Sequence, residues 1–320
     1  MKDSDLLRTL DVFLGGAKKP LVVVLGPTAS GKTSLSIKIA NYVGAVPRGD
    51  TGALRGEIVN SDSRQLYRLL DIGTAKISEE EMEGVKHHLI DVKDPGEEVT
   101  VGWYQKETTQ IIDEIHKKGS VPVLTGGSML YISSIVDGLT LAESPDLEMH
   151  RRLEDEYDEN DGELLYKKLQ KVDPDTAANI HKNNKPYVIR AMEIYEMHNA
   201  PKKEVVRKKG CEYELLMIGI DVSRDILLKR IEERTELMLE NGWIEEVREL
   251  LRLGYSESDP GMKSCGYREI IQYIREIDAD ADPEFAMETL KKAIITKTRQ
   301  YAKRQMTWWR NDDRIKWISG

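Results

Sequence analysis

The stretch that decides the fold is LVVVLGPTASGKT, residues 21–33. Its first part, Leu21–Leu25, is a continuous apolar run rich in β-branched residues, which is typical of a strand buried on both faces of a parallel sheet. Residues 26–33 fit the pattern G-x-x-x-x-G-K-[ST], and a helical pattern follows them. In such a loop, glycines let backbone amides and a helix N-terminus approach phosphate oxygens. The stretch therefore predicts a phosphate-binding loop between a strand and a helix.

Strand and helix patterns alternate along most of the remaining chain. Further strand candidates occur at 57–60, 121–124, 215–220 and 315–318, with helical patterns between them. This alternation predicts an α/β fold with a P-loop NTPase-like parallel sheet flanked by helices.

Two segments interrupt the alternation. Residues 44–56 are rich in glycine without periodicity and predict an exposed loop. Residues 142–205 have helical patterns without a strand, which predicts a helical insertion. The expected organisation is a catalytic core of residues 1–141 and 206–320 with an inserted helical domain at 142–205.

The composition excludes several classes of protein. The chain has 320 residues, of which 40% are hydrophobic and 32% charged, so it is neither disordered nor fibrous. No apolar run reaches the ~18–20 residues of a membrane helix, and the N-terminal residues lack the pattern of a secretory signal. The two cysteines, Cys211 and Cys265, make neither a metal-binding spacing nor a disulfide framework. We expect a cytoplasmic protein with no membrane partner.

Charge is segregated along the chain. The net charge is −9, which by itself disfavours nucleic acid. However, residues 142–163 hold ten acids and two arginines, whereas 181–209 hold eight Lys/Arg and three Glu, and 291–310 hold seven Lys/Arg and no acid. One basic segment is commonly a solvated helix face. Two such segments with interleaved aromatics indicate a surface for a polyanion.

The acid that an ordinary P-loop ATPase uses to hold Mg²⁺ at a strand end is missing. The best candidate strand, 121–124, is followed by Thr125-Gly126-Gly127. This disfavours a motor or switch ATPase, and we expect that ATP is neither consumed nor required. Phosphoryl or pyrophosphate chemistry of another kind remains.

Two other clusters are candidates for the same site. Asp62 follows the strand at 57–60, and the carboxyl ends of parallel strands are where ligands bind in open α/β sheets. Asp62 is alternatively a cap of a following helix. Arg230 and Arg234 share one face of a predicted helix, where they either reach a phosphate or pair with neighbouring glutamates.

Taken together, these residues resemble the tRNA dimethylallyltransferase (tRNA isopentenyltransferase) family, from about residue 20 to the end of the chain. The combination of motifs in this order is far more specific than any one of them. The matching pieces are GPTASGKT (26–33), NSDSRQLY (60–67), DIGTAK (71–76), HHLIDV (87–92), GGSMLYI (126–132), VDPDTAANIH (172–181), VIRAMEIYE (188–196), RIEERTELML (230–239), CGYREIIQY (265–273) and TRQYAKRQMTWWR (298–310).

The resemblance implies a prenyl transfer. The dimethylallyl group of dimethylallyl diphosphate would move to the N6 amine of the adenine immediately 3′ of the anticodon, adenosine 37 of the tRNA, with release of diphosphate. It implies Asp62 as the general base, with Thr28 and Arg234 also catalytic. It also implies a monomer. The loop motif itself predicts Mg²⁺ as cofactor, because the Thr33 hydroxyl can hold this ion.

The resemblance also assigns binding residues. Diphosphate would be bound by Gly26, Thr28, Ala29, Ser30, Gly31, Lys32, Thr33 and Arg234. The tRNA would be bound by Asp62, Ser63, Arg64, Gln65, Ser128, Pro186, Tyr187, Arg190, Lys263, Ser264, Cys265, Gly266, Tyr267 and Arg268. Ser128 stands where the family usually has Thr, and Pro186 and Tyr187 stand where polar or basic residues are usual, so stacking would replace a charge contact there.

Three alternatives have to be separated from this interpretation. The same chemistry on a free nucleotide, as in an adenylate isopentenyltransferase, would not need the basic segment at 291–310. A small-molecule or nucleotide kinase also combines a P-loop with an arginine-bearing lid. A P-loop-derived RNA-binding module would carry no chemistry.

Overall fold

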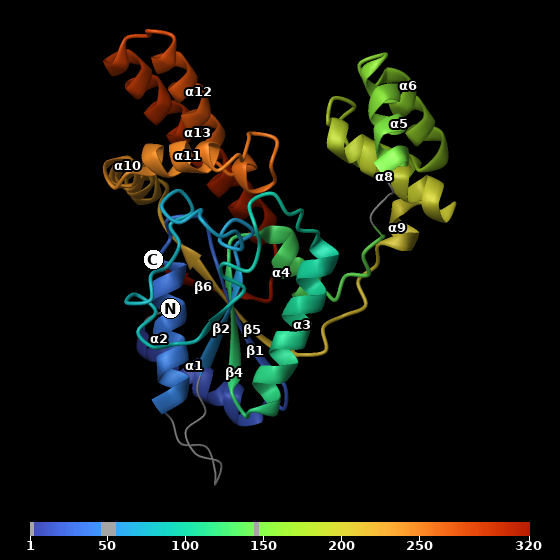
Figure 1. Cartoon of the computed structure of the whole chain (residues 1–320). Helices are drawn as coiled ribbons and strands as arrows, with labels where there is room; N and C mark the ends of the chain where they lie inside the picture. The colour runs from blue at the N-terminus through green and yellow to red at the C-terminus, as the bar shows by residue number, and fades with distance from the viewer. Residues whose placement is uncertain (1–2, 46–55, 144–146) are drawn as a thin grey trace. The chain divides into compact units, whose positions relative to one another are not determined.

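The computed structural model describes residues 3–45, 56–143 and 147–320 (Figure 1). The chain forms two compact units. The first consists of Met1–Val99, Tyr104–Ile132 and Glu212–Gly320, and the second of Thr100–Trp103 and Ser133–Cys211. The loop expected at 44–56 lies almost entirely outside the described residues.

The first unit is built on a parallel sheet, as predicted. Its strands are ordered β3-β2-β4-β1-β5-β6. They are β1 (Pro20–Leu25), β2 (Gly56–Ser61), β3 (His87–His88), β4 (Val121–Gly126), β5 (Glu214–Asp221) and β6 (Ile315–Ser319). Five of them contain the five strand candidates, and β3 adds a short edge strand.

Helices cover both sides of this sheet. Helix α2 (Lys32–Ala45) lies on one side of the strands and α3 (Val101–Lys117) on the other (Figure 1). Helix α1 (Asp3–Gly16) adds Leu6, Leu10 and Leu14 to the core that α2 makes with the sheet. These three side chains follow an i, i+4 pattern, so they form a single apolar face. Helix α4 (Met129–Val136) follows β4.

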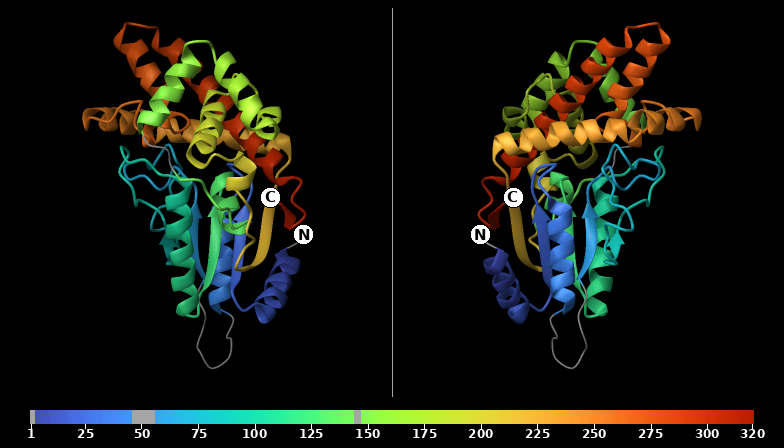
Figure 2. Two further views of the ribbon diagram at one scale, coloured as in Figure 1. Left: turned by 90° about the vertical axis from the view of Figure 1, so that its right-hand side faces the viewer. Right: turned by 90° about the vertical axis from the view of Figure 1, so that its left-hand side faces the viewer.

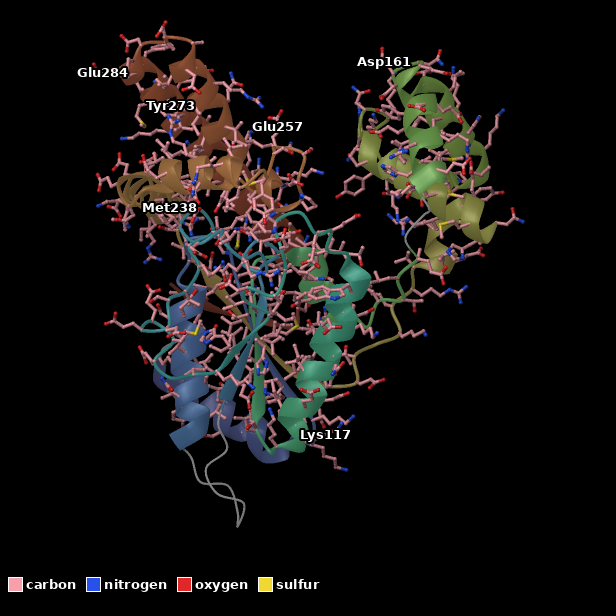
Figure 3. All side chains as sticks on the ribbon, viewed as in Figure 1. Lys117, Asp161, Met238, Glu257, Tyr273 and Glu284 are labelled. Carbon is pink, nitrogen blue, oxygen red and sulfur yellow. The ribbon has the colours of Figure 1, made fainter. Side chains whose placement is uncertain are left out.

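A second group of helices gathers at one end of the strands, coloured orange to red in Figure 2. Trp243, Tyr267 and Ile294 are among the buried residues of their shared core. Met238, labelled in Figure 3, lies on the side of this group that is nearest the strands. The helices are α10 (Arg224–Glu240), α11 (Trp243–Arg252), the short η2 (Gly261–Lys263), α12 (Tyr267–Asp278) and α13 (Pro283–Trp309).

The second unit has its own small core. Leu153, Leu165, Leu169, Val188 and Met192 are buried in it. Asp173 fixes a bend between two helices, because its carboxylate accepts hydrogen bonds from Thr176 N and Lys202 N. The helices are α5 (Leu147–Asp158), α6 (Glu163–Val172), α7 (Pro174–Asn179), α8 (Lys185–His198) and α9 (Lys202–Val205). None of the helices described in either unit is long and apolar enough to cross a membrane.

Candidate active site

The phosphate-binding loop joins β1 to α2 in the predicted position. Its backbone is tightly constrained, because a Cβ on Gly26 would lie 2.9 Å from Ser30 Oγ and 3.2 Å from Ile220 O. Gly31 has φ +92°, a left-handed conformation that side chains disfavour. The two glycines of the motif therefore serve close packing and backbone conformation at the start of α2.

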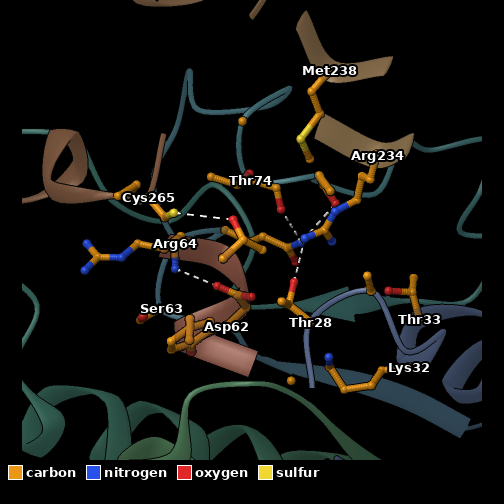
Figure 4. Close-up of a pocket in the computed structure, with 18 of the residues that line it drawn as sticks. Thr28, Lys32, Thr33, Asp62, Ser63, Arg64, Thr74, Arg234, Met238 and Cys265 are labelled. Atoms are coloured by element: carbon orange, nitrogen blue, oxygen red, sulfur yellow. Dashed lines mark hydrogen bonds between the residues drawn. The ribbon is translucent and has the colours of Figure 1, made fainter. Parts of the chain in front are cut away.

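A cavity of about 650 Å³ opens at this loop, within the first unit (Figure 4). Its wall includes Thr28 and the loop residues up to Thr33, and the polar residues that follow β2. Arg234 and Met238 of α10 line it as well, together with one face of α13. The carboxyl ends of β1, β2 and β4 thus meet the second group of helices around one open cavity, as expected for a ligand site in an open α/β sheet.

Two cations of the cavity bond to uncharged oxygens. Lys32 Nζ donates a hydrogen bond to Pro27 O at 2.8 Å, and Arg234 Nη2 donates to Thr28 Oγ1 at 2.6 Å. Burial lowers the pKa of Lys32 to about 8, Asp62 opposes this shift and Arg234 adds to it. Burial also lowers the pKa of Arg234. Arg234 therefore reaches the phosphate loop, as one of its two predicted roles requires, and does not pair with the glutamates beside it on α10.

Asp62 is held in a turn at the cavity wall. Its carboxylate Oδ1 accepts a hydrogen bond from Arg64 N at 2.9 Å. Asn60 fixes the backbone of Asp62, because its Oδ1 accepts from Asp62 N and its Nδ2 donates to Asp62 O. A turn follows residue 62, so the expectation that Asp62 caps a helix is wrong. Among the described residues, Asp62 Oδ2 makes no hydrogen bond and is available to a ligand.

The other residues after β2 are fixed by hydrogen bonds within the protein. Ser63 N donates to Ser128 Oγ at 2.9 Å, and the Ser128 side chain is buried. Arg64 Nη1 donates to Pro260 O at 3.0 Å. Gln65 Nε2 donates to Thr74 O and Ala75 O. Ser63, Arg64 and Gln65 line the cavity beside Asp62, whereas Ser128 supports them from behind.

The segment Lys263–Arg268 contributes four of its six residues to the cavity. Lys263, Ser264, Cys265 and Arg268 line it. Tyr267 is instead buried, and its hydroxyl donates to Glu246 Oε1 at 2.6 Å. Gly266 N donates to Glu269 Oε2 in the N-terminal turn of α12.

Pro186, Tyr187 and Arg190 belong to the second unit, at the start of α8. Tyr187 is 57% exposed, which leaves its ring free for stacking. Arg190 is engaged inside its own unit, because its guanidinium pairs with Glu193 and donates to Ala142 O and Glu143 O. The sequence did not indicate this internal role for Arg190.

Glu246 of α11 is a site residue that the sequence analysis missed. Its carboxylate accepts hydrogen bonds from Asp71 N, Ile72 N and Gly73 N at 2.8, 2.7 and 3.2 Å. It thereby fixes the loop whose residues 73–75 line the cavity. No sequence signal marks it, because a glutamate on an amphipathic helix has the pattern of an ordinary surface charge.

The residues around the cavity determine how a metal ion could be bound. The part of the chain that the structure describes holds no cluster of three or more His, Cys, Asp or Glu that could bind a metal. At the end of β4, Ser36 Oγ donates to Thr125 Oγ1 at 2.7 Å, where an ATPase would place its acid. Thr33 is exposed in the first turn of α2. These residues fit Mg²⁺ that brings its own phosphate and water ligands, which is how Mg²⁺ is commonly bound.

Comparisons with known proteins agree on one family. Residues 65–312 match the family model described as IPP transferase. A tRNA dimethylallyltransferase of Acetivibrio thermocellus is 41% identical over 303 residues, which cover 93% of this chain and 91% of the relative. A tRNA isopentenylpyrophosphate transferase of Bacillus halodurans, solved by crystallography, is 38% identical with a TM-score of 0.64 and covers 94% of this chain and 90% of its own. A eukaryotic dimethylallyltransferase acting on tRNA is 25% identical with a TM-score of 0.71 and covers 94% and 74%.

Proposed function

The chain belongs to the IPP transferase family and transfers a dimethylallyl group to tRNA, and we propose how its own residues carry out that transfer. The observation that carries the proposal is the cavity, in which an available carboxylate oxygen of Asp62 shares one volume with the phosphate loop and Arg234. The donor is dimethylallyl diphosphate, and the acceptor is the N6 amine of the adenine immediately 3′ of the anticodon. Binding there requires that the adenine leave the base stack of the anticodon loop.

The diphosphate occupies the loop and the cations above it. Lys32 and Arg234 supply positive charge, and the Thr28 hydroxyl and loop amides supply hydrogen-bond donors. As the bond between the allylic carbon and oxygen breaks, negative charge grows on the diphosphate, so these groups stabilise the transition state more than the bound substrate.

Asp62 accepts a proton from the adenine amine. An exocyclic amine of a base is a weak nucleophile, and positive charge develops on its nitrogen while the new carbon–nitrogen bond forms. The available oxygen of Asp62 hydrogen-bonds the amine and then takes its proton. Asn60 and the Arg64 backbone amide hold the carboxylate in place for this step.

Mg²⁺ would be held by oxygens of the diphosphate and by the Thr33 hydroxyl. When bound, it neutralises charge on the departing diphosphate. Among the described residues we assign Thr33 alone to this ion, and the cavity cations Lys32 and Arg234 neutralise the remaining charge of the diphosphate. No step of the proposal uses ATP.

The exposed cations of α13 favour tRNA over a free nucleotide as the acceptor. Arg299 and Lys303 on this helix and Arg310 directly after it are exposed and form no ion pair with any residue in 3–45, 56–143 or 147–320. A free nucleotide offers too few phosphates to use such a surface, whereas an RNA backbone matches it. The free Cys211 and Cys265 suit the cytoplasm.

One experiment separates this proposal from the alternatives. The purified protein is incubated with Mg²⁺, radiolabelled dimethylallyl diphosphate and either total tRNA, AMP or ATP. We expect label on tRNA alone, at the adenine next to the anticodon. Label on AMP or ATP would identify a free-nucleotide enzyme, and phosphate transfer from ATP would identify a kinase.

A further inference from the structure

A buried glutamine on α13 joins the phosphate loop to the loop that follows β4. Gln305 is only 1% exposed. Its Oε1 accepts a hydrogen bond from Thr28 N at 2.8 Å, and its Nε2 donates to Gly127 O at 2.8 Å. The two loops follow adjacent strands, β1 and β4, in which Leu25 pairs with Gly126. One side-chain amide therefore ties together the carboxyl ends of two neighbouring strands.

The surroundings of Gln305 are shaped for this contact. A Cβ on Gly127 would lie 2.3 Å from Gln305 Nε2, so only glycine allows the approach. Tyr301, one turn earlier on α13, donates to the same Gly127 O at 3.0 Å. Burying an amide is unfavourable unless it is hydrogen-bonded. Gln305 is bonded at both ends to backbone groups, so its position is fixed by the fold and not by another mobile side chain.

These bonds determine what Thr28 can still do. The backbone N–H of Thr28 is used by Gln305, and the hydroxyl oxygen accepts a hydrogen bond from Arg234 Nη2 at 2.6 Å. A hydroxyl has one proton to donate besides its lone pairs. With the N–H anchored and a lone pair bound to Arg234, the hydroxyl proton of Thr28 is left for a ligand in the cavity.

We propose that Gln305 is a positioning residue for the departure of the diphosphate, acting through Thr28. Gln305 fixes the backbone of Thr28, Arg234 orients the hydroxyl, and the hydroxyl donates to a diphosphate oxygen on which negative charge grows. Such a donor works only when it is held in place before the charge develops. This inference rests on the proposed function of the cavity.

The first test is Gln305→Met, which keeps the length of the side chain and removes both hydrogen bonds. Misplacement of a catalytic group by about 1 Å can cost 10²-fold in rate, so we expect kcat to fall between about tenfold and a hundredfold. The KM for tRNA should change by less than about threefold, because α13 keeps its exposed cations. Gln272→Met on α12, which replaces an exposed glutamine, is the matched control and should keep the wild-type kcat.

The second test asks whether Gln305 acts through Thr28. Thr28→Val removes the hydroxyl and keeps the shape and the backbone N–H. If Gln305 only positions this hydroxyl, Gln305→Met should cost less than about threefold in single-turnover rate in the Thr28→Val background, because coupled residues are not additive. Two losses that multiply, or a wild-type kcat in Gln305→Met, would overturn the inference.

Stability is measured in parallel by thermal unfolding, which shows whether each variant folds. If Gln305→Met does not fold, Gln305→Leu replaces it with the same two measurements, because the smaller side chain leaves room for water beside Thr28 N. A wild-type protein that transfers no label to tRNA would instead contradict the proposed function, so the two failures are distinguishable.

Discussion

The cavity of the first unit and the helical second unit use positive charge in opposite ways. In the cavity, Lys32 and Arg234 donate to neutral oxygens, and burial lowers the pKa of both. In the second unit, Lys182 pairs with Glu163, and Lys185 with Asp158 and Glu154. Hydrogen bonds to Glu163 and Asp158 raise the pKa of Lys182 and Lys185, respectively.

The difference shows where charge is available to a ligand. A cation paired with a carboxylate is largely neutralised, so it attracts a further anion less strongly. Exposed ion pairs of this kind contribute little to the stability of the fold. A buried cation without a carboxylate partner is unfavourable until an anion arrives. In the basic segment at 181–209, five of the eight basic side chains pair with carboxylates of their own unit, two of them with the acidic segment at 142–163. Lys32 and Arg234 form no ion pair among the described residues.

The largest effect is expected at Asp62, the cavity carboxylate that makes no ion pair among the described residues. Asp62→Asn keeps the shape and an acceptor but cannot take a proton. Loss of a general base typically lowers the rate ~10²–10⁴-fold. The single-turnover rate at saturating substrates should fall by this factor, while affinity for tRNA stays nearly unchanged.

The matched control is Asp158→Asn in the second unit, which loses its pair with Lys185. Its single-turnover rate should equal that of the wild type, because Asp158 serves only an exposed ion pair. An Asp62→Asn variant with near-normal chemistry would show that the cavity carboxylate is structural and that the base lies elsewhere.

The next effect concerns binding of tRNA through α13. Arg299→Ala, Lys303→Ala and Arg310→Ala together remove three exposed cations without a carboxylate partner in the described chain. Each phosphate contact adds about 0.7–0.9 to the slope of log affinity against log salt. We expect the triple variant to lower this slope by about two to three, and affinity at physiological salt by about tenfold to a hundredfold.

A second triple variant, Lys182→Ala, Lys185→Ala and Lys203→Ala, changes the charge of the second unit by the same amount. Each of these lysines pairs with a carboxylate of its own unit. The salt slope should therefore change by less than about one. Equal salt slopes in the two triple variants would show that the lysines of the second unit bind RNA despite their ion pairs.

The sequence predicted the sheet and the phosphate loop well, because both are local patterns. Apolar runs mark β1, β2, β4, β5 and β6, and the loop motif places the cavity at the carboxyl end of β1. It also pointed to Asp62, but left it between a base and a helix cap. The turn after residue 62 excludes the helix cap, and the available Oδ2 is compatible with the proposed base.

The supporting residues could not be predicted because they bind backbone groups far away in sequence. Gln305 and Thr28 are separated by 277 positions, and Glu246 binds amides of residues 71–73. A side chain that hydrogen-bonds to backbone groups needs no particular residue type at the partner position. No sequence pattern therefore reveals the contact. The ion pairs of Lys182 and Lys185 were hidden for a related reason, since their partners lie in other helices of the unit.

The smallest effect is a pH dependence set by Lys32. The pKa of Lys32 is about 8, below the ordinary 10.5. Its side chain is therefore mostly a charged ammonium below pH 8 and mostly a neutral amine above it. A neutral amine cannot attract diphosphate, and kcat/KM reports the pKa of the free enzyme. The kcat/KM for dimethylallyl diphosphate should therefore fall about tenfold between pH 7 and 9. Lys32→Arg should show a flat profile over this range, because a guanidinium keeps its proton.

The pKa of Lys32 depends on two neighbouring charges. Asp62 raises the pKa of Lys32 and Arg234 lowers it. Asp62→Asn should therefore move the fall in donor binding to lower pH, and Arg234→Ala should move it to higher pH, as measured by equilibrium binding of the donor. Removing the charge of Lys185 in the second unit should move it in neither direction. A pH dependence of donor binding that is unchanged by both cavity substitutions would mean that Lys32 does not titrate in this range. The cavity cations would then be as fully neutralised as those of the second unit.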